Sequence, residues 1–485
     1  MLWIALYLPE LPLQFAQRGA RHEQALVIAD GPGNRPLVCC ANEAARDLGV
    51  KPGMTIAAAR ALAVDMVTLS RDPNGEAQAL QNLAVWAYQF TPGVVIHAAG
   101  GLLLEVEAAL KLHKGLANLL ARIRQDSLEL GYRIVPGVAP TPVAAWLFAR
   151  ARHAGCAART CTDSARLPDR LRDIPLALLD WPQDVLRHLA GLGITRIGQC
   201  LALPRDGFTK RFGKEALLDL DKALGSVPDP RPCFIPPDTF SCRAEFGFEA
   251  SDALMLLFPL NKLLKELEGY LRGRGVGVQQ WRLVLEHSAR RTSVIAMGTV
   301  APERDAGRLL ALARERLGRV ALSAPALAIR VEAEEFFTFE ERTQSWLPEE
   351  HQSTANWHHL IDKLASRLGG EKIYRLQAVD EHRPEKSARR IAAAAPKSPA
   401  LPRVRSPRPL WLLAPPRDLL TENGQPLCQG RLELIAGPER IESGWWDGRP
   451  VGRDYYVARN PHGETLWIYR EHRHRDAWYL HGLFA

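Results

Sequence analysis

Acidic residues beside two apolar strands are the first candidates for chemistry in this chain. The stretch Pro92–Val106 (PGVVIHAAGGLLLEV) reads as an apolar strand with Glu105 near its end, and the N-terminal strand Leu2–Leu8 is followed by Glu10. Mg²⁺ prefers carboxylate oxygens, and two such ions about 3.5–4 Å apart can drive phosphoryl transfer. Both acids stand at the edges of the apolar runs, so their spacing does not predict a preformed two-metal centre.

Two adjacent glycines, Gly100 and Gly101, interrupt the second apolar stretch. Glycine inside a strand loses conformational entropy and packs no side chain, so its presence needs a reason. One reason is a bulge or a close approach of another backbone. The other is the loss of functional side chains that once stood at these positions.

The two strands resemble the metal-binding motifs of Y-family DNA polymerases, which read hhhDxD in the first strand and S-x-D-E in the later one. On these motifs the three metal-binding acids fall on Ala5, Gly100 and Gly101. The chain is therefore most similar to the catalytically vacant, ImuB-type branch of that family. This resemblance implies no polymerase activity, no cofactor and no bound metal. A low-activity translesion polymerase that uses Glu10 and Glu105 is the alternative.

Two further segments resemble the same family and depart from it where it binds phosphate. ANEAARDLGVKPGM is similar to Y-x-A-R-x-x-G-V-x-x-G-M, with Arg46 retained as a vestigial nucleotide-site residue and Glu43 in place of the tyrosine. GYRIVPGVAPTPVAAWLFAR is similar to the segment G-I-A-x-N-K-x-x-A-K-x-A, with Pro142 and Trp146 in place of the lysines. An acid beside a triphosphate is repulsive, so these departures speak against nucleotide use.

The resemblance implies an α+β multidomain fold, a right hand of palm, fingers, helical thumb and βαββαβ little finger with a small β-rich C-terminal module. The expected parts are palm-like 1–20 and 75–165, fingers-like 21–74, thumb-like 166–228, little-finger-like 238–345, a helix, strand and basic Pro-rich linker over 346–409, and the module over 410–485. In the thumb-like part, L-G-I-x-x-I-G resembles the second half of a helix-hairpin-helix. Two interpretations remain: a subdomain that binds DNA phosphate, and a plain helical subdomain that does not.

Composition fits a DNA-associated protein without requiring one. The 485 residues carry a net charge of +8, which suits a polyanionic partner. The eight cysteines lack the C-x-x-C spacing of a zinc site, and the first apolar stretch is too short for a signal peptide or a membrane span. These features fit a cytoplasmic protein. The resemblance to a little finger implies DNA binding that is independent of sequence, with Arg272, Arg274, Arg290 and Arg291 placed to reach the DNA backbone.

A short segment after the little-finger-like part, Thr343–Pro348, resembles the sliding-clamp ligand Q-x-x-L-F. Gln344 and Leu347 match the motif, while Pro348 stands where phenylalanine is expected. The resemblance implies a sliding clamp as a partner, although short motifs also recur by chance.

The last stretch is rich in tryptophan and tyrosine and resembles the end of ImuB-type proteins. A flexible tether from Arg383 to Pro409 is expected before it. Neighbours on a strand face opposite sides, so one of Trp445 and Trp446 should lie off the core. By resemblance, the partners are a DnaE-type error-prone polymerase and a RecA-like, ImuA-type protein in translesion synthesis during the SOS response. A protein-only scaffold is the other alternative. The residues expected to dock partners are Trp445, Trp446, Tyr455, Trp467 and Trp478.

Overall fold

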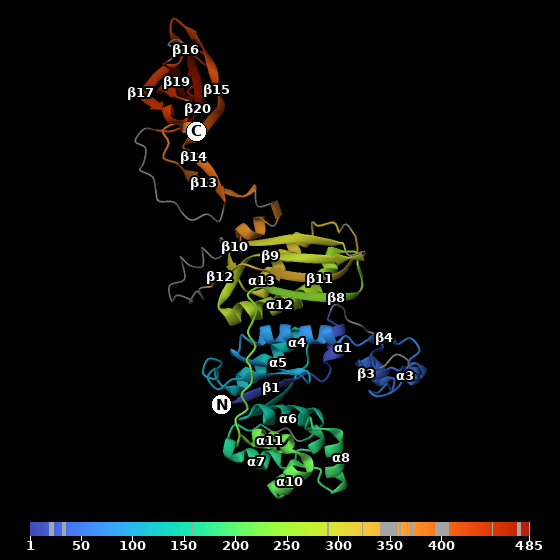
Figure 1. Ribbon diagram of the computed structural model, residues 1–485. Coiled ribbons are helices and arrows are strands. Elements are labelled where there is room, and N and C mark those ends of the chain that lie inside the picture. Colours follow the sequence, from blue (N-terminus) through green and yellow to red (C-terminus); the bar gives the residue numbers. More distant parts are fainter. Residues whose placement is uncertain are drawn as a thin grey trace. The chain divides into compact units, whose positions relative to one another are not determined.

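The chain forms two units, Met1–Arg367 and Leu368–Ala485. The computed structural model (Figure 1) describes residues 1–18, 24–31, 35–156, 160–288, 291–322, 324–339, 357, 360–365, 367–368, 372–392, 407–448, 450–472 and 477–484.

The palm-like domain is built on a four-stranded sheet with the strand order β5-β6-β1-β7. The central strand β1 runs antiparallel to both of its neighbours, β6 and β7. Pro92–Val106 is therefore a hairpin of two strands, not the single strand that its apolar run predicts. Its turn contains Gly100 at φ +88°, a conformation that L side chains rarely adopt. The strands are β1 (Trp3–Tyr7), β5 (Gly93–His97), β6 (Gly101–Glu105) and β7 (Val135–Ala139).

Side chains alternate between the two faces of this sheet, and each face is buried in an apolar core. Ile4 and Leu6 pack toward α4 and α5, whereas Ala5 and Leu103 belong to the core that includes α6. Helix α6 lies directly on β7: a Cβ at Gly137 would stand 2.2 Å from the carbonyl oxygen of Ala145. The helices are α1 (Leu11–Ala16), α4 (Pro73–Ala87), α5 (Leu116–Glu129) and α6 (Pro142–His153).

The fingers-like domain is a small sheet with two short helices. Its strand order is β3-β2-β4. Both helices begin at capping side chains, since Asn42 accepts a hydrogen bond from the backbone N–H of Ala45 and Thr55 from that of Ala58. The elements are β2 (Leu26–Asp30), β3 (Leu37–Ala41), β4 (Val67–Ser70), α2 (Glu43–Asp47) and α3 (Ile56–Leu62).

The thumb-like domain is helical and shares one apolar core with α6. After its last helix the chain runs without regular structure along the palm, where the N–H of Phe234 donates to the carbonyl of Val94 at 2.6 Å. The helices are α7 (Leu167–Leu171), α8 (Gln183–Gly191), α9 (Ile197–Leu201), α10 (Arg205–Phe212) and α11 (Lys214–Leu224), with the short helices η1 (Ser164–Arg166) and η2 (Leu176–Leu178).

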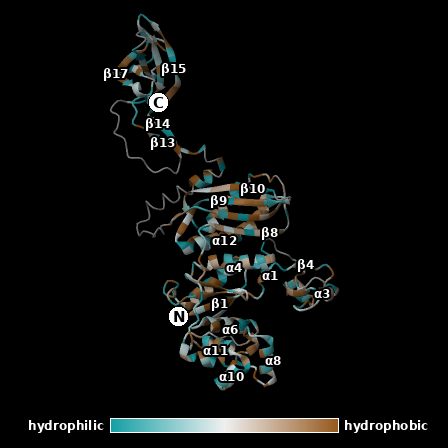
Figure 2. Cartoon of the chain, in the orientation of Figure 1, coloured by the Kyte–Doolittle hydropathy of each residue, from teal (hydrophilic) through white to brown (hydrophobic). Residues whose placement is uncertain are grey.

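The little-finger-like domain has the β-α-β-β-α-β order that the sequence predicts, with one short extra strand, β12. Its sheet order is β10-β9-β11-β8, with β12 paired to β9. The strands carry both hydrophobic and hydrophilic residues (Figure 2), as expected when helices cover one face and leave the other open. The elements are β8 (Phe240–Ala250), η3 (Ala253–Leu256), α12 (Leu257–Arg274), β9 (Val276–His287), β10 (Thr292–Glu303), α13 (Ala306–Leu317), β11 (Ala326–Ala333) and β12 (Phe336–Thr338).

The second unit is a six-stranded antiparallel sheet with a two-stranded arm. The sheet order is β16-β15-β20-β19-β18-β17, and the arm pairs β13 with β14. The arm strands are β13 (Tyr374–Ala378) and β14 (Ala388–Ala392), joined through η6 (Pro384–Lys386). The sheet contains β15 (Trp411–Glu422), β16 (Gln425–Leu427), β17 (Glu433–Ser443), β18 (Val451–Arg459), β19 (Thr465–Glu471) and β20 (Trp478–Leu483), with the turn η7 (Trp445–Asp447).

Candidate functional site

The positions at which the sequence resemblance predicts vacant metal-binding sites lie in or beside the palm-like core. Ala5 is fully buried and pairs with Leu103 across the β1–β6 ladder. Gly101 pairs with Tyr7, and a Cβ at Gly101 would stand 2.4 Å from the carbonyl oxygen of Leu6 and 2.6 Å from the ring of Trp146. Because one of these neighbours is backbone, no side chain fits at Gly101 without a shift of the strand or of Trp146.

Aromatic rings fill the space beside Gly101, and we call Tyr7, His97 and Trp146 the aromatic plug. The His97 ring stacks on Trp146 with centroids 3.8 Å apart, and Tyr7 meets Trp146 edge-on at 5.3 Å. Burial, together with Arg231 and Arg150 nearby, lowers the pKa of His97 to about 4. Burial also raises the pKa of Tyr7. The plug is therefore neutral at pH 7 and offers no charge to a metal ion or phosphate.

The two acids that could rescue metal binding do not lie together at this place. Arg46, which the resemblance predicts to be a vestigial nucleotide-site residue, forms an ion pair with Glu10 at 2.5 Å. Glu105 ends β6, four residues from Gly101, which is about 13 Å along a strand. Across the described residues, no three His, Cys, Asp or Glu side chains are grouped so that they could hold a metal ion.

The arginines predicted to bind DNA are in part engaged within the protein. Arg272 pairs with Glu268 at 2.6 Å, and Arg274 pairs with Asp238 at 3.1 Å while also donating to the hydroxyl of Tyr270 at 2.7 Å. Arg291 is exposed at the turn between β9 and β10. Arg290 lies outside the described residues, as do Gln344 and Leu347 of the clamp-like segment.

In the C-terminal module the structure corrects three of the five docking residues. Tyr455, Trp467 and Trp478 are 1%, 2% and 6% exposed, because a small sheet with two apolar faces needs large rings as its core. Trp445 and Trp446 are 79% and 56% exposed. They do not sit on a strand as the sequence suggests, but in the turn η7 between Gly444 and Gly448, both of which have left-handed backbone conformations.

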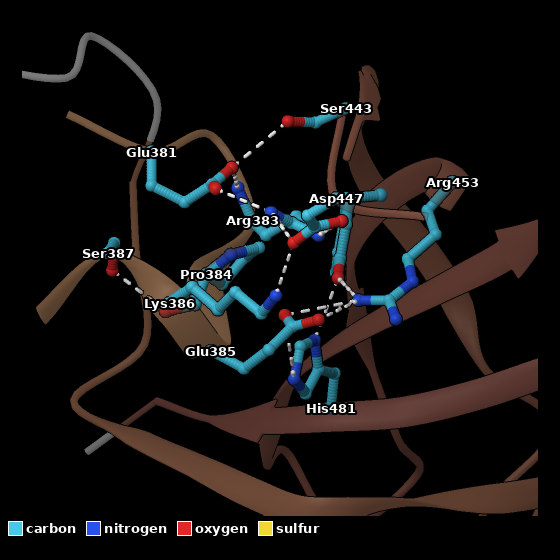
Figure 3. Close-up of polar contacts among 11 residues, drawn as sticks. Glu381, Arg383, Pro384, Glu385, Lys386, Ser387, Ser443, Asp447, Arg453 and His481 are labelled. Atoms are coloured by element: carbon cyan, nitrogen blue, oxygen red, sulfur yellow. Dashed lines mark hydrogen bonds and ion pairs between the residues drawn. The ribbon is translucent and has the colours of Figure 1, made fainter. Parts of the chain in front are cut away.

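The arm is joined to this sheet by a group of ion pairs that we call the clasp (Figure 3). Arg383, which is 2% exposed, donates to Glu381 at 2.7 Å and to Asp447 at 2.8 Å. Glu385 accepts from Arg453 at 3.0 Å. The predicted flexible tether therefore cannot begin at Arg383, because residues 381–392 are an ordered part of the module.

Sequence reasoning missed the partners in both clusters. From the sequence, Trp146 was noted only as a replacement of a lysine. A large ring in one segment and two glycines in another are departures of opposite size, and together they could have indicated that the ring packs against the glycines. For Trp445 and Trp446, the flanking Gly444 and Gly448 were the signal of a turn. No local pattern predicted that Arg383 joins the arm to the sheet, because Asp447, its partner on the sheet side, is distant in sequence.

Comparisons with known proteins agree with this architecture. The model of the impB/mucB/samB family (IMS) matches residues 15–150. Protein ImuB of Caulobacter vibrioides (strain NA1000 / CB15N) is 29% identical over 481 residues, which cover 90% of this chain and 100% of that protein. DNA polymerase IV of Dehalococcoides mccartyi (strain CBDB1) is 25% identical over 268 residues, which cover 54% of this chain and 67% of that protein.

Solved structures give weaker likenesses. The insertion ternary complex of Dbh DNA polymerase is 19% identical with a TM-score of 0.41, and the match covers 68% of this chain and 98% of that chain. DinB from Sulfolobus solfataricus is 20% identical with a TM-score of 0.38, and the match covers 70% of this chain and 100% of that chain.

Residues 15–150 are similar to the impB/mucB/samB family, and the α+β architecture agrees with that similarity. The predicted resemblance to ImuB-type proteins is confirmed by the match to protein ImuB. None of the helices in the described ranges has the length and apolar character needed to cross a bilayer.

Proposed function

We propose that this chain is a Y-family-like protein without polymerase activity. The observation that supports this most is the contact at Gly101, where the Leu6 carbonyl and the Trp146 ring occupy the space that a carboxylate side chain would need. Two-metal phosphoryl transfer requires carboxylate ligands held close together. Ala5, Gly100 and Gly101 supply none, and Glu10 is paired with Arg46.

The test is primer extension by the purified full chain with Mg²⁺ or Mn²⁺, on intact and damaged templates, beside an active DNA polymerase IV. We expect no incorporation above background. Template-dependent extension that disappears in the Glu10→Gln or Glu105→Gln variant would instead identify a low-activity translesion polymerase.

The chain then acts as an adaptor in DNA damage tolerance. It binds DNA independently of sequence and gathers a sliding clamp, a DnaE-type error-prone polymerase and a RecA-like, ImuA-type protein for SOS-induced translesion synthesis in the cytoplasm. The resemblance to ImuB-type proteins, the net charge of +8 and the exposed pair Trp445 and Trp446 support this role. Binding of protein partners without DNA would identify a protein-only scaffold.

Clamp binding is assigned to Gln344 and Leu347 by their match to the clamp-ligand motif. The Gln344→Ala, Leu347→Ala double variant should no longer co-elute with the clamp, while its DNA affinity stays unchanged. A double variant that still co-elutes removes this motif from consideration.

A further inference from the structure

The open face of the little-finger-like sheet is neutralised by its own side chains. Arg243 on β8, Arg330 on β11 and Arg282 on β9 project from this face, and each forms an ion pair with a glutamate. Glu286 alone accepts from Arg243 at 2.9 Å and from Arg330 at 2.8 Å. Phosphate groups would have to displace these carboxylates, and the four glutamates outnumber the three arginines: Glu245, Glu286, Glu332 and Glu334.

The helix side of the same domain carries cations that are not neutralised in this way. Arg314 and Arg316 lie in the last turn of α13, and Arg319 follows just after the helix. All three are exposed, and within the described residues none forms an ion pair.

A second helical segment, residues 360–365, adds to this charge. Arg367 forms a two-pronged contact with Glu315 on α13, at 2.9 and 3.0 Å. Arg367 first, and then Lys363 and Arg319, lower the pKa of the Glu315 carboxyl, so Lys363 and Arg319 lie within electrostatic range of this acid. We call this set the α13 basic face: Arg314, Arg316, Arg319, Lys363 and Arg367. Arg367 is paired with Glu315, and within the described residues the other four form no ion pair.

We infer that the α13 basic face, not the open sheet face, holds the DNA backbone. The inference rests on the proposed function, in which the chain binds DNA. Exposed guanidinium groups present a planar fork of donors that matches phosphate, and unpaired ones do so without first breaking an ion pair. Contacts of this kind reach phosphates and not base edges, so binding at this face is independent of sequence.

The test uses the full chain and a fluorescent primer–template duplex, with affinity measured by anisotropy across a series of salt concentrations. For Arg314→Gln, Arg316→Gln, Arg319→Gln we expect at least a tenfold loss of affinity at low salt. The slope of log K against log salt should become shallower by up to about 2.7, since each phosphate contact contributes about 0.9. The matched control, Arg243→Gln, Arg282→Gln, Arg330→Gln, should change the slope by less than about 0.9.

A second variant keeps the test valid if the triple change disturbs α13. Arg319→Gln with Lys363→Gln leaves the residues of α13 intact and should make the slope shallower by up to about 1.8. A wild-type chain that does not bind DNA overturns the proposed DNA-binding role itself. A wild-type chain that binds, with an unchanged slope in both α13-face variants, overturns this inference alone. An α13-face variant with wild-type DNA affinity that loses an acidic protein partner overturns it as well.

Discussion

Two clusters of aromatic rings, one in each unit, can be compared. In the palm-like domain, Trp146 packs against Gly101 and His97. In the C-terminal module, Trp467 stacks on Tyr455 with centroids 4.1 Å apart, in a sheet that ion pairs join to the arm. Both clusters bury large rings next to a histidine. The aromatic plug stands beside Gly101, and the groups nearest Gly101 are apolar or neutral.

The module's cluster keeps its charges at the edge. Tyr455 receives a hydrogen bond from Arg453 at 3.1 Å and shares another with His481 at 2.8 Å, and Arg453 in turn donates to Glu385 of the clasp. The rings of the plug thus meet mainly apolar or neutral groups, while the rings that form the core of the small sheet also have polar partners at the rim. The two clusters should therefore respond independently of each other to truncation, and the plug and the clasp should respond to acid at different pH.

Truncation of the central rings should have the largest effect. We expect Trp467→Ala to lower the free energy of unfolding of the second unit by about 3–5 kcal/mol, and Trp146→Ala to do the same to the first unit, because each leaves a cavity in a packed core. Hydrogen exchange of the full chain, read on peptides from β6 and β19, measures both. If either substitution alone speeds exchange in the peptides of both strands, the two clusters are not independent.

Acid should weaken the plug before it weakens the clasp. The pKa of His97 is about 4 in the folded protein, below its ordinary value of 6.5, so the unfolded chain binds the proton first. Stability from His97 is thus present above pH 6.5 and is lost as the pH falls toward 4, by up to about 3 kcal/mol. Denaturant unfolding of the first unit should show this loss, and the His97→Gln variant should lack it.

The clasp should respond at lower pH. Hydrogen bonds from Arg383 lower the pKa of Glu381 from 4.5 to about 2, so its stabilising contribution is present above pH 4.5 and is lost as the pH falls toward 2. Exchange at arm amides should therefore rise only in this second window. In the Glu381→Gln variant, the arm amides should exchange fast already at pH 7. Equal exchange at these amides in the variant and the wild type would show that the Glu381 carboxylate does not stabilise the arm.

A smaller effect should follow from adding one methyl group to the plug. Gly101→Ala places a Cβ against the Leu6 carbonyl and the Trp146 ring, and overpacking of this kind costs about 1–3 kcal/mol. The matched control is Gly298→Ala on β10, where the nearest atom would stand 3.7 Å away. Equal stability of the two variants would show that the strand yields easily and that shape does not exclude a side chain here.

These comparisons also show what the sequence could predict. The apolar runs, the β-α-β-β-α-β order and the β-rich end follow from local patterns, and all three are observed. The hairpin at Gly100 was missed because the adjacent glycines, although common in turns, lie within an apolar run and were explained by a bulge or by lost side chains. The plug was missed because Trp146 and Gly101 meet through tertiary packing, which no local pattern encodes.

The C-terminal aromatics illustrate the same limit. Composition indicated that some rings must be buried and others exposed, but not which ones. Trp467 and Trp478 lie on strands of the sheet and are buried, while Trp445 is lifted away by a glycine-flanked turn. The choice depends on where the chain turns and on the arm that covers the sheet, and Arg383 reaches Asp447 across 64 residues.

The smallest effect on stability, and the largest on association, should come from Trp445 and Trp446. Their rings meet edge-on at 5.3 Å and stay largely exposed, so replacing both with alanine should change the free energy of unfolding by no more than about 0.5 kcal/mol. Exposed tryptophans that fill a partner's pocket often cost 2 kcal/mol or more of binding energy when truncated. In pull-downs from cells with damaged DNA, the double variant should therefore lose the DnaE-type polymerase or the RecA-like protein and keep its DNA affinity.

The control is Leu420→Ala, which removes an exposed apolar side chain on β15 and should leave both interactions unchanged. If the tryptophan variant retains both partners, docking lies elsewhere in the chain, and the contrast between buried and exposed rings in this module has no role in recognition.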